Sequence, residues 1–311
     1  MAKQRNQAGK SEDRRPKSER NPKPEGRNQQ CSGSGLSSRC GWRFHQFRFI
    51  CAGMRSAITT MLTLGCALAA GAQIHTETVE YRDGDTVLEG YLAYDTAIQG
   101  KRPGVLIVQQ WMGLTDYEKK RAEMLAKLGY NVFALDIYGK GIRPKTSQEA
   151  GAQAGKYKGN RALLRERAQA GLAILEKQEL TDSQRVAAIG YCFGGTTVIE
   201  LARSGADIAG VVSFHGGLDS PHPEDGRNIK CKVLALQGAD DPFVPAKDLA
   251  AFEDEMRQAK VDWELVKYGG AVHSFTEQDA GDNPARGAAY NEKADRRSWE
   301  AMKEFLAELF K

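Results

Sequence analysis

The sequence predicts an α/β fold with a mainly parallel, doubly wound sheet and helices on both of its faces. Two observations support this prediction. Short apolar runs alternate with helically spaced apolar stripes from residue 76 to the end of the chain, the order expected of βαβ units. The run at residues 104–108 is continuously apolar, as in a parallel strand covered on both faces. We therefore expect one domain over residues 74–311.

The predicted elements can be taken in chain order. Alternating residues around Asp83 predict an N-terminal hairpin over residues 76–94. Thr115 and Glu118 have the spacing of a capping box, and the helix that they begin ends at Gly129. The polar stretch up to about Lys158 suggests no element. Further strands are expected at 132–135, 185–189, 208–214, 233–236 and 263–268, and further helices near 160–178, 196–203 and 246–259 and around 299–309.

Positive charge is concentrated at the N-terminus. Residues 1–53 contain 12 Lys and Arg against 4 Asp and Glu, so this segment has a net charge of +8 and residues 54–311 have −4. With little apolar surface to bury, the segment is expected to be disordered. A basic arm that binds nucleic acid is less favoured than an upstream start codon chosen in error. The basic balance of the whole chain therefore does not indicate a nucleic-acid-binding fold.

Residues 54–72 have the three parts of a secretory signal peptide. A short positive segment at 54–56 precedes an apolar run at 57–70 that is too short to span a bilayer, and Ala-Gly-Ala at 70–72 is a cleavage site. A lipoprotein signal at Cys66 is disfavoured, because Thr63 stands where an apolar residue is preferred. We expect a periplasmic or secreted protein that begins near Gln73 and does not stay inserted in a membrane. Four of the six cysteines precede that point, and the other two, Cys192 and Cys231, are predicted to stay free.

The glycine-rich turn at residues 190–195, Gly-Tyr-Cys-Phe-Gly-Gly, is the candidate catalytic element. A predicted strand enters a predicted helix through this turn, which is the build of a nucleophile elbow with Cys192 where serine is commoner. The helix N-terminus beside the sulfur favours a thiolate. The alternative is that Cys192 is only a small buried residue.

A cysteine nucleophile needs a base, and the base needs a group that orients it. Where an elbow supplies the nucleophile, the acid and then the histidine follow it along the chain. Asp241 follows a later predicted strand, with Asp240 as the competing acid; either could instead cap a turn. His273 follows the last predicted strand, whereas the other four histidines precede the acid. His215 ends a strand and is expected to line the site without taking part in the chemistry.

An oxyanion hole needs two preorganised backbone N–H groups. We expect one from Phe193, directly after the nucleophile, and one from the loop at residues 109–113, after the first core strand. The histidines are few and lack ligand spacing, so no metal site is predicted. No cofactor is expected either.

Four ordered blocks of this sequence resemble dienelactone hydrolases: residues 190–195, Ala-Asp-Asp-Pro-Phe-Val-Pro at 239–245, His-Ser-Phe at 273–275 and Asp-Ile-Tyr-Gly at 136–139. The resemblance extends over residues 76–311. It implies an α/β-hydrolase fold in which Cys192 is the nucleophile, His273 the base and Asp241 its orienting carboxylate. Trp111 and Phe193 fall on the family's oxyanion-hole positions.

Two residues depart from the family pattern. Gln110 stands where the family usually has a glutamate that assists activation of the thiol. Glu277 stands where the dienelactone-cleaving members have an arginine for the substrate carboxylate. Lys140, just after the 136–139 block, is the candidate replacement for that cation, and Tyr138 in the block is a further candidate substrate contact. Because Gln110 cannot repel a thiolate, we expect a standing thiolate–imidazolium pair, and because of Glu277 we expect a preference for neutral substrates.

The sequence thus predicts a hydrolase that cleaves small carboxylic esters, lactones or thioesters through an acyl-cysteine. An amidotransferase-like enzyme also uses a cysteine elbow, but it would lack the ordered motifs around Asp241 and His273. A non-catalytic binding protein on the same scaffold remains as the alternative, since fold does not determine function.

Overall fold

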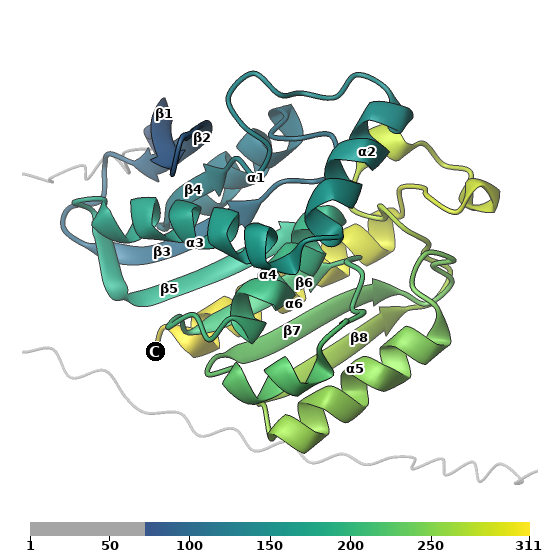
Figure 1. The fold of residues 1–311 in the computed structure, drawn as a ribbon. Helices are drawn as coiled ribbons and strands as arrows, with labels where there is room; N and C mark the ends of the chain where they lie inside the picture. The colour runs from purple at the N-terminus through teal and green to yellow at the C-terminus, as the bar shows by residue number, and fades with distance from the viewer. Residues whose placement is uncertain (1–71) are drawn as a thin grey trace, which may run out of the picture. The chain divides into compact units, whose positions relative to one another are not determined.

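The computed structural model describes residues 72–311. The predictions of a disordered extension and of a signal peptide concern residues outside this range and stay predictions. The described residues form an eight-stranded sheet with the strand order β1-β2-β4-β3-β5-β6-β7-β8 (Figure 1). The strands are β1 (Ile74–Asp83), β2 (Thr86–Asp95), β3 (Arg102–Val108), β4 (Asn131–Leu135), β5 (Thr181–Tyr191), β6 (Gly210–Phe214), β7 (Lys232–Gly238) and β8 (Trp263–Tyr268).

Strand direction confirms the predicted sheet. The hairpin β1–β2 is antiparallel and joins β4 antiparallel, whereas every later pairing, from β4–β3 to β7–β8, is parallel. Parallel strands need crossover connections, and helices supply them here. The helices are α1 (Asp116–Ala126), α2 (Ser147–Lys158), α3 (Arg161–Lys177), α4 (Phe193–Arg203), α5 (Ala246–Ala259) and α6 (Glu292–Leu309), with short 3-10 turns at Pro223–Asn228, Gln278–Ala280 and Pro284–Arg286.

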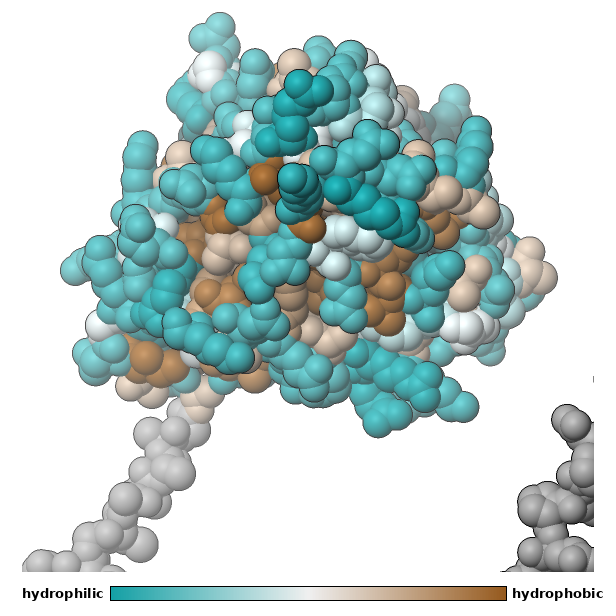
Figure 2. All heavy atoms as spheres, turned by 90° about the horizontal axis from the view of Figure 1, so that it is seen from below, coloured by the Kyte–Doolittle hydropathy of each residue, from teal (hydrophilic) through white to brown (hydrophobic). Residues whose placement is uncertain are grey.

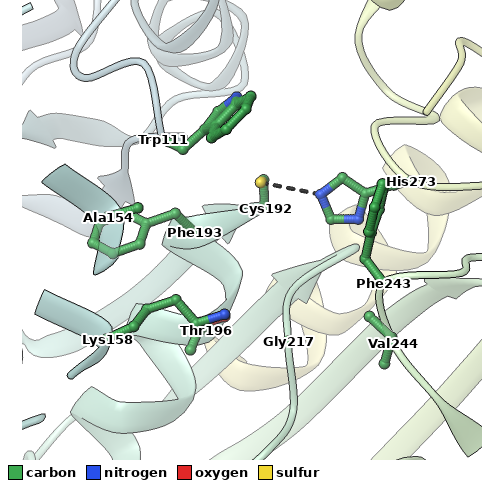
Figure 3. A pocket seen from close by; sticks show the side chains of 10 residues that line it. All are labelled: Trp111, Ala154, Lys158, Cys192, Phe193, Thr196, Gly217, Phe243, Val244 and His273. Carbon is green, nitrogen blue, oxygen red and sulfur yellow. Dashed lines mark hydrogen bonds between the residues drawn. The ribbon is translucent and has the colours of Figure 1, made fainter. Parts of the chain in front are cut away.

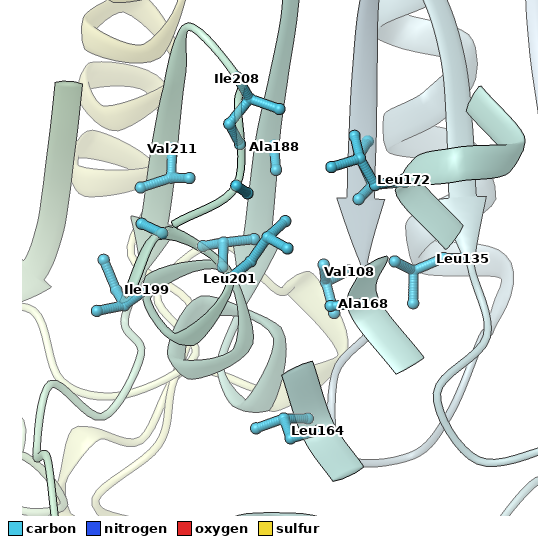
Figure 4. Close-up of a cluster of buried hydrophobic side chains, with 14 of the residues drawn as sticks. Val108, Leu135, Leu164, Ala168, Leu172, Ala188, Ile199, Leu201, Ile208 and Val211 are labelled. Atoms are coloured by element: carbon cyan, nitrogen blue, oxygen red, sulfur yellow. The ribbon is translucent and has the colours of Figure 1, made fainter. Parts of the chain in front are cut away.

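Both faces of the sheet are buried. Side chains from α1 and α6 pack with Val105 and Ile107 on one face, and side chains from α3, α4 and α5 pack with Leu106 and Val108 on the other. Figure 4 shows the second cluster, in which Leu172 of α3 lies against the strands. The alternation explains why residues 104–108 are apolar throughout: each face of β3 has its own helix layer.

Helix α2 lies in the polar stretch where no element was predicted. Its buried residues are Ala150, Ala154 and Tyr157, too few for an apolar stripe, so the sequence pattern does not reveal it. Thr146 caps it by accepting a hydrogen bond from the Glu149 amide. Packing of Tyr157 on the rings of Tyr138 and Phe193, 5.5 and 6.5 Å between centroids, helps to hold the helix near the elbow.

Hydrophobic side chains reach the surface shown in Figure 2 as separate patches among hydrophilic ones. Among residues 72–311, no helix combines the length and apolar character that a membrane span requires. The loops that follow β3, β5, β6, β7 and β8 all leave from the carboxyl edge of the parallel sheet. Ligands of such sheets bind beyond this edge, and the predicted site residues follow these strands.

Candidate active site

The elbow conformation is present at Cys192. Cys192 has φ 55° and ψ −114°, backbone angles that are strained for any residue other than glycine, and it directly precedes α4. A Cβ at Gly190 would lie 2.1 Å from the Gly194 oxygen, and one at Gly194 would lie 2.2 Å from the Val108 oxygen. These backbone contacts explain the glycines on both sides of the cysteine: strand and helix approach too closely for a side chain.

His273 lies between Cys192 and Asp241. Its Nε2 is 3.1 Å from the Cys192 sulfur and its Nδ1 is 2.8 Å from Oδ2 of Asp241. The other Asp241 oxygen accepts a hydrogen bond from the Phe243 amide, which fixes the carboxylate. Asp240 instead accepts a hydrogen bond from the Gly270 amide. Geometry therefore favours Asp241 over Asp240 as the partner of the histidine.

The environment of His273 favours its charged form. Burial by itself lowers the pKa of His273, but the neighbouring Cys192 sulfur and the hydrogen-bonded Asp241 carboxylate outweigh it and raise the pKa to about 10. An imidazolium beside the sulfur is the arrangement that stabilises a thiolate.

His215 contacts the backbone of Cys192. The Cys192 amide donates to the Phe214 carbonyl at 3.0 Å and also to Nδ1 of His215 at 3.2 Å. With Nδ1 as an acceptor, the proton of the ring is on Nε2, which donates a hydrogen bond to the Thr276 hydroxyl at 2.9 Å. Full burial and the neighbouring His273 lower the pKa of His215 well below its usual value. A neutral His215 therefore links the turn at Cys192 to the loop after His273.

The candidate oxyanion-hole loop is positioned by the predicted capping box. Glu118 is fully buried; one carboxylate oxygen accepts hydrogen bonds from the Thr115 amide and hydroxyl, and the other accepts one from the Gln110 amide at 3.0 Å. Within residues 72–311, the backbone amides of Trp111 and Phe193 donate no hydrogen bond. Both residues line a hollow with Cys192, so their N–H groups are free to serve a ligand there.

The predicted substrate contacts lie in different places. Tyr138 is buried and donates to the Trp111 carbonyl at 2.9 Å, so it supports the loop. The Gln110 side chain lies close enough to Glu277 to lower the pKa of its carboxyl group. Lys140 is not brought to the site: its amide donates to Val87 on β2, and its amino group pairs with Glu80 on the hairpin.

Two hollows, of about 170 and 290 Å³, meet at Cys192. Trp111, Cys192, Phe243 and His273 line both. The smaller hollow, which we call the α2-side hollow, is completed by Ala154, Lys158, Phe193, Thr196, Gly217 and Val244 (Figure 3). The larger one is completed by Ser274 and Ala288. Sequence analysis missed Lys158, because α2 itself was not predicted, and it missed Phe243, whose role as a wall depends on the fold.

The parallel sheet with a strained cysteine turn between β5 and α4 defines an α/β-hydrolase fold. The family model described as dienelactone hydrolase family matches residues 88–310, and the chain belongs to that family. It is a family of hydrolases, and carboxymethylenebutenolidase-like relatives make it a lactone hydrolase family in the broad sense. The predictions of family and fold are confirmed.

Similar proteins support the same assignment. The chain is 41% identical to the dienelactone hydrolase-like promiscuous phosphotriesterase P91 from metagenomic libraries, with 78% of this chain and 100% of that one covered and a TM-score of 0.73. It is 39% identical to a structure named m3DLH, covering 76% and 99%, with a TM-score of 0.74. A Bradyrhizobium sp. protein named "Probable 2-oxo-3-(5-oxofuran-2-ylidene)propanoate lactonase" is 30% identical over 65% of this chain and 86% of its own length.

Proposed function

We propose that this protein hydrolyses carboxylic esters, lactones or thioesters through an acyl-cysteine. The most direct support is the pair of hydrogen bonds that His273 forms, through Nε2 to the Cys192 sulfur and through Nδ1 to the Asp241 carboxylate. This is the arrangement that nucleophilic catalysis by a thiol requires. The test is turnover of 4-nitrophenyl esters by the protein, together with an acyl adduct on Cys192 detected by mass spectrometry of the intact chain. Binding of esters without turnover or adduct would instead favour a non-catalytic binding protein.

The proposed reaction has two stages. The Cys192 thiolate attacks the carbonyl carbon, and the oxyanion accepts hydrogen bonds from the Trp111 and Phe193 amides. The tetrahedral adduct collapses to a thioester while the His273 imidazolium donates its proton to the departing alkoxide. A water molecule then attacks the thioester through its oxygen, while His273 accepts a proton from that water. Collapse of this second adduct releases the acid and restores the thiolate–imidazolium pair.

Reactivity of the thiol tests whether the resting pair is ionised. We expect iodoacetamide to inactivate the protein at neutral pH faster than it alkylates a free cysteine, because the His273 imidazolium stabilises the thiolate. The rate should keep this advantage until His273 loses its proton near pH 10. In Gln110→Glu inactivation at neutral pH should be slower, because a further negative charge in the loop before Trp111 opposes the thiolate.

The control for this experiment is Gln178→Glu, which changes the net charge equally but lies at the end of α3, before β5 begins. It should leave the inactivation rate unchanged. A wild-type rate no higher than that of a free cysteine at the same pH would contradict the ionised pair. An unchanged rate in Gln110→Glu would show that residue 110 does not control the thiol.

We further propose that the part of the substrate nearest Gln110 and Glu277 is uncharged. Burial raises the pKa of Glu277, while the Gln110 side chain and the charge of His273 oppose that rise. Repulsion between a substrate carboxylate and an ionised Glu277 about 4 Å away costs about 1 kcal/mol of binding free energy in water, and more in a dry site. For a compact lactone acid we expect kcat/KM to be lower than for its neutral methyl ester, and Glu277→Gln should narrow the difference.

Lys140→Met provides the matched control, because Lys140 pairs with Glu80 away from both hollows. It should change kcat/KM for neither lactone. A wild-type preference for the acid that disappears in Lys140→Met would instead assign the substrate carboxylate to Lys140.

A further inference from the structure

Lys158 contributes a positive charge to the α2-side hollow. It is the last residue of α2, and Figure 3 shows its side chain extending toward Thr196 on α4. Its amino nitrogen lies 3.7 Å from the position that a Cβ on Gly217 would occupy. The absence of a side chain at Gly217 therefore leaves the amino group open to the hollow.

Lys158 forms no ion pair within residues 72–311. One oxygen of Asp219, on the same loop as Gly217, is hydrogen-bonded to Arg161 at 2.8 Å. The other Asp219 oxygen lies 3.1 Å from the Cβ position on Gly217, so this carboxylate also borders the wall beside Lys158. The N-terminal end of α4, which includes Thr196, adds further positive potential at this wall.

Hydrogen bonds fix the loop that contains Gly217. Buried Arg203 donates to the carbonyls of Leu218 and Asp219, both at 3.1 Å, and Gln237 donates to the Gly216 carbonyl at 2.7 Å. Arg203 is itself bonded to Glu255. Because this loop is already fixed, an anion entering the hollow does not have to order it first.

The two hollows differ in the charge of the side chains that line them. The larger one has no charged side chain besides His273. Figure 3 shows His273 beside Cys192 and the end of the Lys158 side chain beside Thr196. His273 lines both hollows, so the charge of Lys158, and not the distance to the base, distinguishes the α2-side hollow. Neither Gln110 nor Glu277 lines either hollow, so Lys158 and His273 are the two ionisable basic side chains that line the α2-side hollow.

We propose that the α2-side hollow is a subsite for a carboxylate at the end of the acyl arm, so that open-chain half-esters of dicarboxylic acids are preferred substrates. Lys158 pairs with that carboxylate, and Thr196 offers it a hydroxyl donor. The proposal rests on the proposed ester hydrolysis and adds to it the charge of one substrate arm.

The test compares mono-4-nitrophenyl glutarate with 4-nitrophenyl pentanoate, whose acyl arm has a methyl group in place of the carboxylate. In Lys158→Met we expect kcat/KM for the glutarate to fall about tenfold or more, mainly through KM. The pentanoate should change less than about twofold. Lys156→Met is the matched control, since the Lys156 amino group lies over the Tyr157 ring and does not line the hollow. It should leave the ratio of the two substrates unchanged.

An unchanged ratio in Lys158→Met, or an equal fall for both esters, overturns the subsite. If the wild type hydrolyses neither ester, the proposed function fails, and the subsite is then judged by binding. Mono-4-nitrophenyl glutarate is titrated into Cys192→Ala and into Cys192→Ala/Lys158→Met. Binding weakened about tenfold by the second substitution supports the subsite without turnover, and equal binding refutes it.

Discussion

Replacing Cys192, His273 or Asp241 by alanine is expected to lower kcat for ester hydrolysis by roughly a thousandfold or more in each case. Each change interrupts the same chain of contacts, from the sulfur through Nε2 and Nδ1 to the carboxylate. The double and triple variants should therefore be little worse than the worst single variant, because groups that act as one unit have non-additive effects. Single-turnover kinetics with a chromogenic ester measures the loss at the acylation step.

Two control variants distinguish a specific loss of catalysis from a loss of folded protein. Cys231 is the other cysteine of the described chain; it is buried, and burial raises the pKa of its thiol to about 12, so Cys231→Ala should keep its activity. Asp240→Asn should cost much less than Asp241→Ala, because Asp240 bonds a loop amide and not the imidazole. Near-normal turnover in His273→Ala, or a larger loss at Asp240 than at Asp241, would refute the assignment.

The second large effect concerns stability. Gly194→Ala should lower the free energy of unfolding by about 3 kcal/mol, because the new methyl group would lie 2.2 Å from the Val108 oxygen and 2.7 Å from the Gln109 oxygen. Both are backbone atoms at the end of β3, so no side chain can move aside to relieve the contact. Equilibrium unfolding in urea, followed by circular dichroism, measures the change in midpoint.

Gly155→Ala is the matched control, since Gly155 lies inside α2 and a Cβ there meets nothing within 4 Å. An alanine inside a helix is favoured over glycine by about 0.5–1 kcal/mol, so this variant should be as stable as the wild type or slightly more stable. If the urea midpoint of Gly194→Ala equals that of the wild type, this result would contradict the close approach of α4 to β3.

Sequence reasoning reached the residues whose positions depend on strand ends. Cys192, Asp241 and His273 each follow a strand with a clear apolar run, and parallel strands bring their carboxyl ends to one edge. The helix over residues 246–259 and the strand over 263–268 were predicted with the bounds that the structure has. These elements have strong local patterns that agree with their tertiary environment.

What the sequence did not show depends on packing between distant segments. Helix α2 is stabilised by contacts of Tyr157 with Tyr138 and Phe193, and no local pattern predicts them. Lys158 was missed with it. The bond from the Cys192 amide to His215 joins residues that are 23 positions apart, and it requires β5 and β6 to be neighbours. Lys140 was placed at the site by family position alone, whereas the turn after Tyr138 directs it toward the hairpin.

The carboxylate of Glu118 joins two segments into one cooperative unit. It closes the first turn of α1 through Thr115 and at the same time fixes the amide of Gln110, next to Trp111. Fraying of that turn would release both bonds together, so the Trp111 loop opens only when the start of the helix opens. Amide hydrogen exchange of Gln110 and Thr115 should accordingly proceed with a common opening free energy. We therefore expect the loop that carries Trp111 to open as slowly as the buried start of α1.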